Sequence, residues 1–241
     1  MSYFNNTDID ALSYAMTAAY HLQETTGTRT DSHASYDLAD NNTVGYSTSG
    51  ISGNAGDFER DNAEYLSLTM DENFDPDDDF AISMWVKLES APADGEQQYL
   101  WTFTDEDDKA KIRGYYRNIG GVYSLQFSVK SSEFTANGMS ITTTLSTGTW
   151  YHIIFTTIDD AGKFAAWVNG SKTTGSSFGV WDGHVGNFFV GTTCNSGIKS
   201  SYWDGLIDEV YYWNNMSTPR FSDEAATALY NSGSGRFYSA Q

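Results

Sequence analysis

Two acidic loops are the first segments of this 241-residue chain in which residue type and spacing could do chemistry. Residues 71–79 read DENFDPDDD, and residues 105–108 are four consecutive acids. Calcium takes several oxygen ligands that converge from one loop. The first loop has Pro76 where an EF-hand needs glycine, and no glutamate closes it. The second loop is tighter and offers Asp105, Asp107 and Asp108 as candidate metal ligands; the alternative is a solvated acidic turn.

Aromatic side chains could stack on the faces of sugar rings if polar groups flank them. Trp181 lies in a loop flanked by glycines, a position that favours exposure. The chain has 7 Trp, 16 Tyr and 14 Phe, so a place in the core is the alternative for every aromatic residue. The candidate ligand-binding residues are Tyr115, Tyr116, Trp181, His184 and Tyr202.

Catalytic groups are harder to find in the sequence. Glycoside hydrolysis needs two carboxyl groups roughly 5–9 Å apart across the sugar bond. Asp208 and Glu209 come nearest to such a pair, but adjacent residues of a strand point to opposite faces. Cys194 has no base beside it in the sequence, and the four histidines lack metal-ligand spacing. We therefore predict that the protein has no catalytic residues and is not an enzyme.

The charge balance excludes some partners. The net charge is −19, from 13 basic and 32 acidic residues, so a nucleic-acid backbone would be repelled. No apolar run approaches membrane-spanning length, so membrane insertion is not expected. The first ten residues, MSYFNNTDID, lack the basic and apolar regions of a signal peptide. A single cysteine excludes an internal disulfide framework.

These candidate residues must be positioned by strands, and the segment 148–172 specifies three of them. Residues 150–158 and 163–169 are two strands, and Asn169-Gly170 favours a type I′ turn into the next strand. Residues 79–89 alternate, with Phe80, Ile82, Met84 and Val86 on one face and Ala81, Ser83, Trp85 and Lys87 on the other. We expect Trp85 and Trp167 to be buried. Further strands are expected at 18–22, 99–104, 115–117, 122–129, 139–145, 187–191 and 202–213.

The ends of the chain favour short helices, and the polar segments favour loops. Residues 7–16 carry a capping pattern followed by helical spacing. Residues 222–231 begin with Ser222 as a cap, and Gly233 is expected to end that helix. Residues 41–56 and 178–186 are expected to be loops. The sequence contains no segment typical of a domain linker, so it predicts one domain over 1–241. The predicted fold is an all-β, two-sheet antiparallel β-sandwich with short N- and C-terminal helices.

Several segments resemble the laminin-G-like jelly roll of the concanavalin A-like lectin/glucanase superfamily. The family pattern W-x-H-V-A-x-T followed by Y-V-N-G is matched by Trp150, His152, Thr156 and then Trp167 to Gly170. D-F-T-I-S-x-W-V-K is similar to residues 79–87, and F-x-G-x-I-D-E-V-x-x-Y is similar to residues 202–212. The resemblance covers about residues 9–235. It places His152 in the core and gives Asp208-Glu209 a structural role.

The resemblance also bears on the candidate sites. Glucanase relatives carry a Glu-x-Asp-x-x-Glu strand motif, which this sequence lacks. Pentraxin relatives place calcium ligands in about the 105–108 loop, with the others in the loop before the closing strand. That loop, residues 192–201, has no carboxylate here. Calcium therefore remains the one cofactor that the sequence puts forward, with neutralisation of the loop by a partner or by solvent as the alternative that we favour.

A non-catalytic binding, adhesion or structural module is the function that this resemblance implies. With no signal peptide in sight, we favour a bacteriophage virion component, either a capsid decoration or a fibre protein. The alternatives are a secreted or cell-surface carbohydrate-binding, lectin-like protein and, third, a glycoside hydrolase. The expected partners are other virion or surface proteins, glycans, or further copies of the chain. The expected location is the virion surface or the extracellular space.

Overall fold

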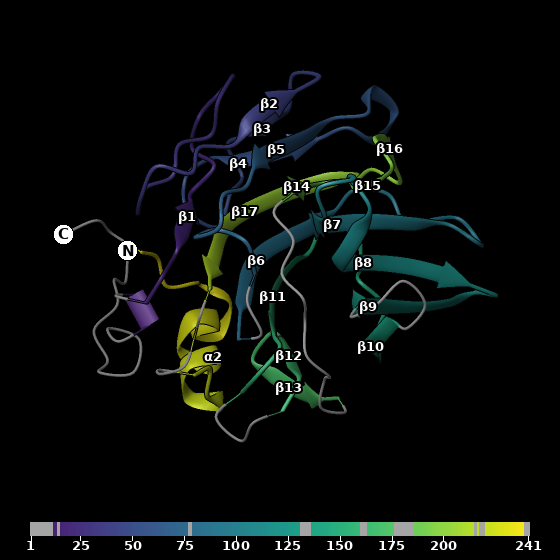
Figure 1. The fold of residues 1–241 in the computed structure, drawn as a ribbon. Coiled ribbons are helices and arrows are strands. Elements are labelled where there is room, and N and C mark those ends of the chain that lie inside the picture. Colours follow the sequence, from purple (N-terminus) through teal and green to yellow (C-terminus); the bar gives the residue numbers. More distant parts are fainter. Residues whose placement is uncertain are drawn as a thin grey trace.

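A computed structural model shows a sandwich of two antiparallel sheets, which confirms the predicted fold class (Figure 1). It describes residues 12–13, 15–76, 79–130, 136–159, 163–175, 186–214, 216 and 220–238. The strands are β1 (Ala18–Tyr20), β2 (Ala39–Asn41), β3 (Gly45–Ser47), β4 (Ala55–Phe58), β5 (Tyr65–Thr69), β6 (Ala81–Leu88), β7 (Gln97–Thr104), β8 (Ala110–Ile119), β9 (Val122–Lys130), β10 (Ala136–Thr142), β11 (Trp150–Thr156), β12 (Ala165–Val168), β13 (Ser171–Thr174), β14 (Asn187–Val190), β15 (Thr193–Asn195), β16 (Ile198–Ser200) and β17 (Gly205–Trp213).

The helical elements are short. They are η1 (Arg60–Asn62), α2 (Asp223–Tyr230) and η2 (Asn231–Gly233). No helix in the described part of the chain is both long and apolar enough to span a membrane. The predicted N-terminal helix at 7–16 falls largely outside the described residues.

The strand order separates the chain into two layers. The eight-stranded sheet runs β13-β12-β11-β6-β17-β4-β3, and β1 also pairs with β17. The seven-stranded sheet runs β10-β9-β8-β7-β14-β5-β2. β15 and β16 form a separate hairpin. The segments between β4 and β5 and between β6 and β7 each cross from one sheet to the other. They leave from the same end of the sandwich, because the last residues of β4 and β6, Phe58 and Leu88, both pair with Gly205 of β17.

The core lies between the two sheets, and the alternation of β6 explains why. Phe80, Ile82, Met84 and Val86 are all buried in it, on the face predicted from the sequence. From the opposite sheet, Trp101 and Phe103 of β7 fill the same cluster. Closely spaced aromatic pairs such as Phe103 and Phe188, with ring centroids 4.7 Å apart, pack its interior.

The other face of the eight-stranded sheet is covered by α2 (Figure 1). Trp167 is fully buried there, and its Nε1 donates a hydrogen bond to Asp223 at 2.9 Å. Trp85 is also buried, and its ring stacks on His152 at 4.8 Å. Both predicted core tryptophans are therefore confirmed.

Local turn and cap chemistry matches the sequence with two corrections. Asn169 and Gly170 have φ of 51° and 76°, as the predicted type I′ turn requires, and Ser222 caps α2. The helix ends at Asn231 (φ 46°) and not at Gly233, because asparagine also tolerates the left-handed conformation. The segment 41–56 is not all loop, because β3 lies within it and pairs with β4.

Candidate functional site

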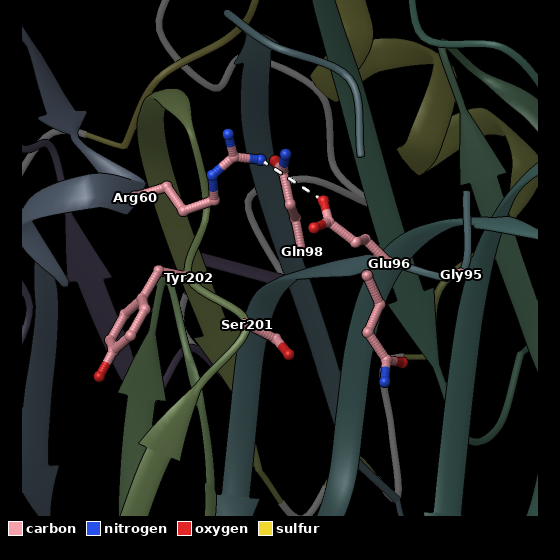
Figure 2. A pocket seen from close by; sticks show the side chains of 7 residues that line it. Arg60, Gly95, Glu96, Gln98, Ser201 and Tyr202 are labelled. Atoms are coloured by element: carbon pink, nitrogen blue, oxygen red, sulfur yellow. Dashed lines mark ion pairs between the residues drawn. The ribbon is translucent and has the colours of Figure 1, made fainter. Parts of the chain in front are cut away.

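A pocket of about 370 Å³ opens at the end of the sandwich where the connections between the sheets converge. Its walls come from η1, from the turn before β7, and from the segment between β16 and β17. Figure 2 shows Arg60 and Glu96 pointing toward each other across it, joined by an ion pair of 3.8 Å. The lining residues are Arg60, Gly95, Glu96, Gln97, Gln98, Ser201 and Tyr202.

Gln98 holds the walls of the pocket in place. It is almost fully buried, and its Nε2 donates to the carbonyl of Ser90 at 3.0 Å. Its Oε1 accepts from the backbone N–H of Asp204 at 3.3 Å. The Ser201 carbonyl accepts from the N–H of Tyr99 at 2.9 Å. These bonds fix the position of the segment that carries Tyr202, so the pocket is preorganised.

Of the sequence-predicted binding residues that the structure describes, Tyr202 is the one that lines this pocket. Its side chain is half-buried, and its ring lies 6.3 Å from the ring of Tyr65, which in turn lies 5.9 Å from Phe189. Burial raises the pKa of the Tyr202 hydroxyl, so this group is a neutral hydrogen-bond donor at pH 7. Tyr202 therefore adds an aromatic residue to a lining whose other members are polar residues and a glycine.

The other predicted binding residues fall in different places. Tyr115 is half-buried and stacks on Tyr99 at 4.7 Å, and the Tyr99 hydroxyl donates to Gln97 Oε1 at 3.3 Å. Tyr115 is thus next to the pocket without lining it. Tyr116 is fully buried, and its hydroxyl accepts from the backbone N–H of Leu145. Tyr115 and Tyr116 point to opposite faces of β8, and Tyr116 is on the face toward the core. Its ring is therefore not accessible to a ligand.

The remaining two candidates, Trp181 and His184, lie outside the described residues. The pocket is completed by residues that the sequence did not single out: Arg60, Gly95, Glu96, Gln97, Gln98 and Ser201. They come from segments far apart in the chain, and no local pattern marks them.

The surroundings of the pocket are acidic. Carboxylate oxygens of Asp57, Glu59 and Glu89 lie within 4.8 Å of one another, and Asp204 adds to their repulsion. Burial and this repulsion raise the pKa of all three. Such a group could hold a divalent cation, but Glu59 and Glu89 are exposed and exposed carboxylates often gather without one.

The predicted calcium loop is partly neutralised by lysines of the same chain. Lys111 Nζ lies 2.9 Å from Asp105 Oδ2, and Lys109 Nζ lies 2.9 Å from Asp107. Asp108 accepts from Asn187 Nδ2 at 2.7 Å. Burial alone would raise the pKa of Asp105, but the backbone N–H of Lys109 and the ammonium of Lys111 outweigh it and lower that pKa.

Those contacts bear on how the acidic residues of this loop are neutralised. Each of the three candidate ligands already has a hydrogen-bonded or cationic partner within the chain. The repulsion among the acids therefore does not call for a calcium ion or for a docking partner.

Asp208 and Glu209 sit at a β-bulge in β17, with Glu209 at φ 50°. Asp208 is fully buried and accepts from the N–H groups of Ile51 and Ser52 at 2.8 and 3.3 Å. Glu209 is 2% exposed, and its Oε2 lies 2.6 Å from His21 Nδ1. These contacts anchor a loop and a strand, which is the structural role that the sequence predicted.

Two further reactive residue types are also packed in the interior. His152 is buried and its Nε2 lies 2.9 Å from Ser83 Oγ; burial lowers its pKa to about 3, so it stays neutral. Cys194 is buried, and burial raises the pKa of its thiol. A neutral histidine and a protonated thiol with no access to solvent are poor nucleophiles.

Comparison with known proteins identifies relatives of this fold. Residues 60–220 match the family model described as the Concanavalin A-like lectin/glucanases superfamily. No curated protein sequence matches the chain. Its structure is similar to the binding domain of Paraclostridial Mosquitocidal Protein 1, with a TM-score of 0.71, 14% identity and coverage of 92% of this chain and 53% of that chain.

Two other solved structures are informative. One is the binding domain of Botulinum neurotoxin DC in complex with rat synaptotagmin II (TM-score 0.66, 12% identity, 92% of this chain and 52% of that chain). The other is domain 4 of AbnA, a GH43 extracellular arabinanase from Geobacillus stearothermophilus, in complex with arabinotriose (TM-score 0.59, 19% identity, 88% of this chain and 96% of that chain). The chain spans about half the length of the two toxin structures.

Proposed function

Because the chain belongs to the concanavalin A-like lectin/glucanases superfamily, we propose that it is a non-catalytic binding module that takes a carbohydrate into the pocket lined by Tyr202. The observation that carries this proposal is the composition of that pocket. An aromatic ring at a wall gives apolar contact to a sugar face, and Arg60, Glu96, Gln97 and Ser201 offer donors and acceptors to its hydroxyls.

Two features support this assignment. The pocket volume lies within the range of small-molecule sites, and Gln98 holds its walls, so a ligand would meet a preformed surface. In addition, the AbnA domain of similar fold is described in complex with an oligosaccharide, arabinotriose.

Binding to a glycan array, followed by titration calorimetry on the glycans that bind, tests the proposal. The variant Tyr202→Ala should lose at least roughly tenfold in affinity, because it removes the aromatic wall. Tyr46→Ala is the matched control, since Tyr46 is 46% exposed and lies on β3 in the other sheet. If no glycan binds, or if the two variants bind equally well, the pocket is not the site.

We do not expect the protein to hydrolyse the glycans that it binds. Asp208 and Glu209 are both buried and engaged in hydrogen bonds, so neither is free to act as an acid or a nucleophile. Reducing-end release from a polysaccharide panel measures this. Turnover that is abolished in Asp208→Asn or Glu209→Gln would contradict the non-catalytic assignment.

As a finer proposal, the module is carried on the surface of a bacteriophage particle, as a capsid decoration or fibre protein. This rests on the sequence expectation, and a secreted or cell-surface lectin is the alternative. Mass spectrometry of purified particles, with antibody labelling of intact ones, tests it. Detection on the particle surface is the expected result; detection in the culture medium alone would favour the alternative.

A further inference from the structure

Three side chains form a row along β8 beside the pocket. Arg113, Tyr115 and Arg117 are alternate residues, so they share one face of the seven-stranded sheet. All three are half-buried, whereas the residues between them face the core and are buried. This Arg113–Tyr115–Arg117 row therefore lies on the outer face of the sheet.

The row leads directly to the pocket. Arg117 stands opposite Gln97 on β7, and Tyr115 stands opposite Tyr99. Directly opposed residues of neighbouring antiparallel strands have side chains in contact on the same face. Gln97 lines the pocket, so the row and the pocket form one continuous surface.

The two arginines of the row carry charges that the described residues leave unpaired. Elsewhere, Arg29, Arg60 and Arg220 have carboxylate oxygens at 3.8, 3.7 and 3.6 Å. No described carboxylate makes such a pair with Arg113 or Arg117. Arg236 is the other described arginine without such a pair, and it lies away from β8 near the end of the chain.

Their hydrogen-bonding capacity is also largely unused. Arg113 donates from Nε to Ser128 Oγ at 3.1 Å and also makes a side-chain hydrogen bond with Tyr99, which leaves its remaining donors to serve other acceptors. The Nε of Arg117 is buried and has no hydrogen-bond partner among the described residues. Burial raises the pKa of Tyr99, while Arg113 and Arg117 act against that shift, which places both guanidinium groups near its phenol.

We infer that the Arg113–Tyr115–Arg117 row binds the acidic group of an anionic glycan, a carboxylate or a sulfate, while the uncharged part of that glycan lies in the pocket beside Gln97. Guanidinium groups recognise carboxylate and sulfate oxygens through paired, charge-assisted hydrogen bonds. Tyr115, between the two charges, adds an aromatic surface of the kind that sugars contact. This inference rests on the proposed function and names its ligand class.

The test compares ligands that share one neutral core. Lactose, 3′-sialyllactose and 3′-sulfated lactose are titrated into the protein at about 20 mM and at about 500 mM salt. We expect both acidic ligands to bind roughly tenfold more tightly than lactose at low salt, as one added charge-assisted contact would give. The advantage should shrink at high salt because the row is solvent-accessible. The sialylated and sulfated arms show which acidic group the row prefers.

A charge-neutral variant locates the effect. Arg113→Gln/Arg117→Gln should bind lactose as the wild type does and lose the preference for the acidic ligands. The control variant Lys163→Gln/Arg220→Gln makes the same change in net charge outside the row, and it should keep the preference for the acidic ligands. If the double variant does not fold, the single variant Arg117→Gln takes its place. The comparison of lactose with the two acidic ligands is made on the wild type and does not depend on any variant.

The outcomes separate the two proposals. Lactose binding that equals or exceeds that of both acidic ligands overturns the inference and leaves the pocket proposal standing. The same holds for a preference that survives in Arg113→Gln/Arg117→Gln. If neither these ligands nor any glycan on a neutral and acidic array binds, the proposed function itself fails and the inference fails with it.

Discussion

Lys111 Nζ lies 2.9 Å from Asp105 Oδ2, and both side chains are largely buried, at 12% and 9% exposure. This ion pair and the neighbouring one between Lys109 and Asp107 offset part of the negative charge of the acidic turn 105–108. The loop that most resembles a calcium site in the sequence is therefore already neutral in part, and its carboxylates have partners.

The first prediction is that calcium leaves the stability of the protein unchanged. A calcium ion bound at a hundredfold excess over its dissociation constant would add about 2.7 kcal/mol to the free energy of unfolding. Thermal unfolding with a chelator, and then with millimolar calcium, measures this. A large upward shift of Tm with calcium, absent in Asp107→Asn/Asp108→Asn, would show that the loop binds the ion after all.

The second prediction concerns the pH dependence of stability set by His21 and Glu209. Burial would lower the pKa of His21, but the hydrogen bond and charge of Glu209 outweigh burial and raise it. The folded state thus holds the proton more tightly than the unfolded state. This contribution to stability is fully present below about pH 6.5 and is lost as pH rises through the folded pKa.

The measurement is chemical unfolding from pH 5.5 upward to about pH 9, for wild type and His21→Gln. The stability of the wild type relative to His21→Gln should fall over this interval. His152 is neutral in the folded state throughout, because burial lowers its pKa to about 3, but it still titrates in the unfolded state near pH 6.5. It therefore adds stability as pH rises through that value in both proteins, and the comparison of wild type with variant removes this contribution. Parallel curves for the two proteins would mean that the His21–Glu209 pair is not charged in the folded state.

The third prediction is that Trp167→Ala lowers the free energy of unfolding by roughly 3–5 kcal/mol. Trp167 is fully buried between β12 and α2, and its Nε1 donates to Asp223. Trp167→Phe, which keeps most of the apolar volume, is the matched variant and should lose less. Urea unfolding of both proteins gives the difference, and wild-type stability of Trp167→Ala would contradict the packing of α2 on the sheet.

The fourth prediction is that Glu89→Gln stabilises the protein at neutral pH. The pKa of Glu89 is raised by burial and then by the charges of Asp57 and Asp204, so the folded state disfavours its ionised form. A raised carboxyl pKa means that stability falls as pH rises through that pKa, and the glutamine removes this loss. The gain in Tm should therefore shrink toward about pH 4.

Glu106→Gln is the control for this charge effect, because Glu106 is exposed at the turn between β7 and β8. A similar gain from both substitutions would reflect only the reduced net charge of the chain. A loss of stability in Glu89→Gln at neutral pH would mean that the three clustered carboxylates have a cationic partner in solution.

The strands of the core could be predicted because each face of the sandwich imposes a two-residue period. The alternation in residues 79–89 correctly places Ile82 and Met84 toward one layer and Trp85 toward the other. Periodicity does not show which side chain is buried when two consecutive residues of a strand are of the same type. Tyr115 and Tyr116 are such a pair, and the sequence treats them equally although only Tyr116 is in the core.

The pocket was harder to predict, because it is assembled from three connections. Tyr202 was a candidate because it is an aromatic residue at the start of the predicted closing strand, whereas Arg60 and Glu96 meet only after both sheets have formed. The row on β8 did leave a signal, since an Arg-x-Tyr-x-Arg pattern on a strand places all three side chains on one face. The pattern does not show that β8 pairs with β7, and it is this pairing that places the row beside Gln97.

The central claim is that the pocket lined by Tyr202 is the glycan site, and amide chemical-shift mapping tests it most directly. An oligosaccharide that binds the protein is titrated into an isotope-labelled sample. We predict that the largest shifts occur at Gly95, Gln97, Ser201 and Tyr202, and that Tyr202→Ala removes them. Saturating shifts confined to other parts of the sandwich, with these four amides unmoved, would contradict the claim.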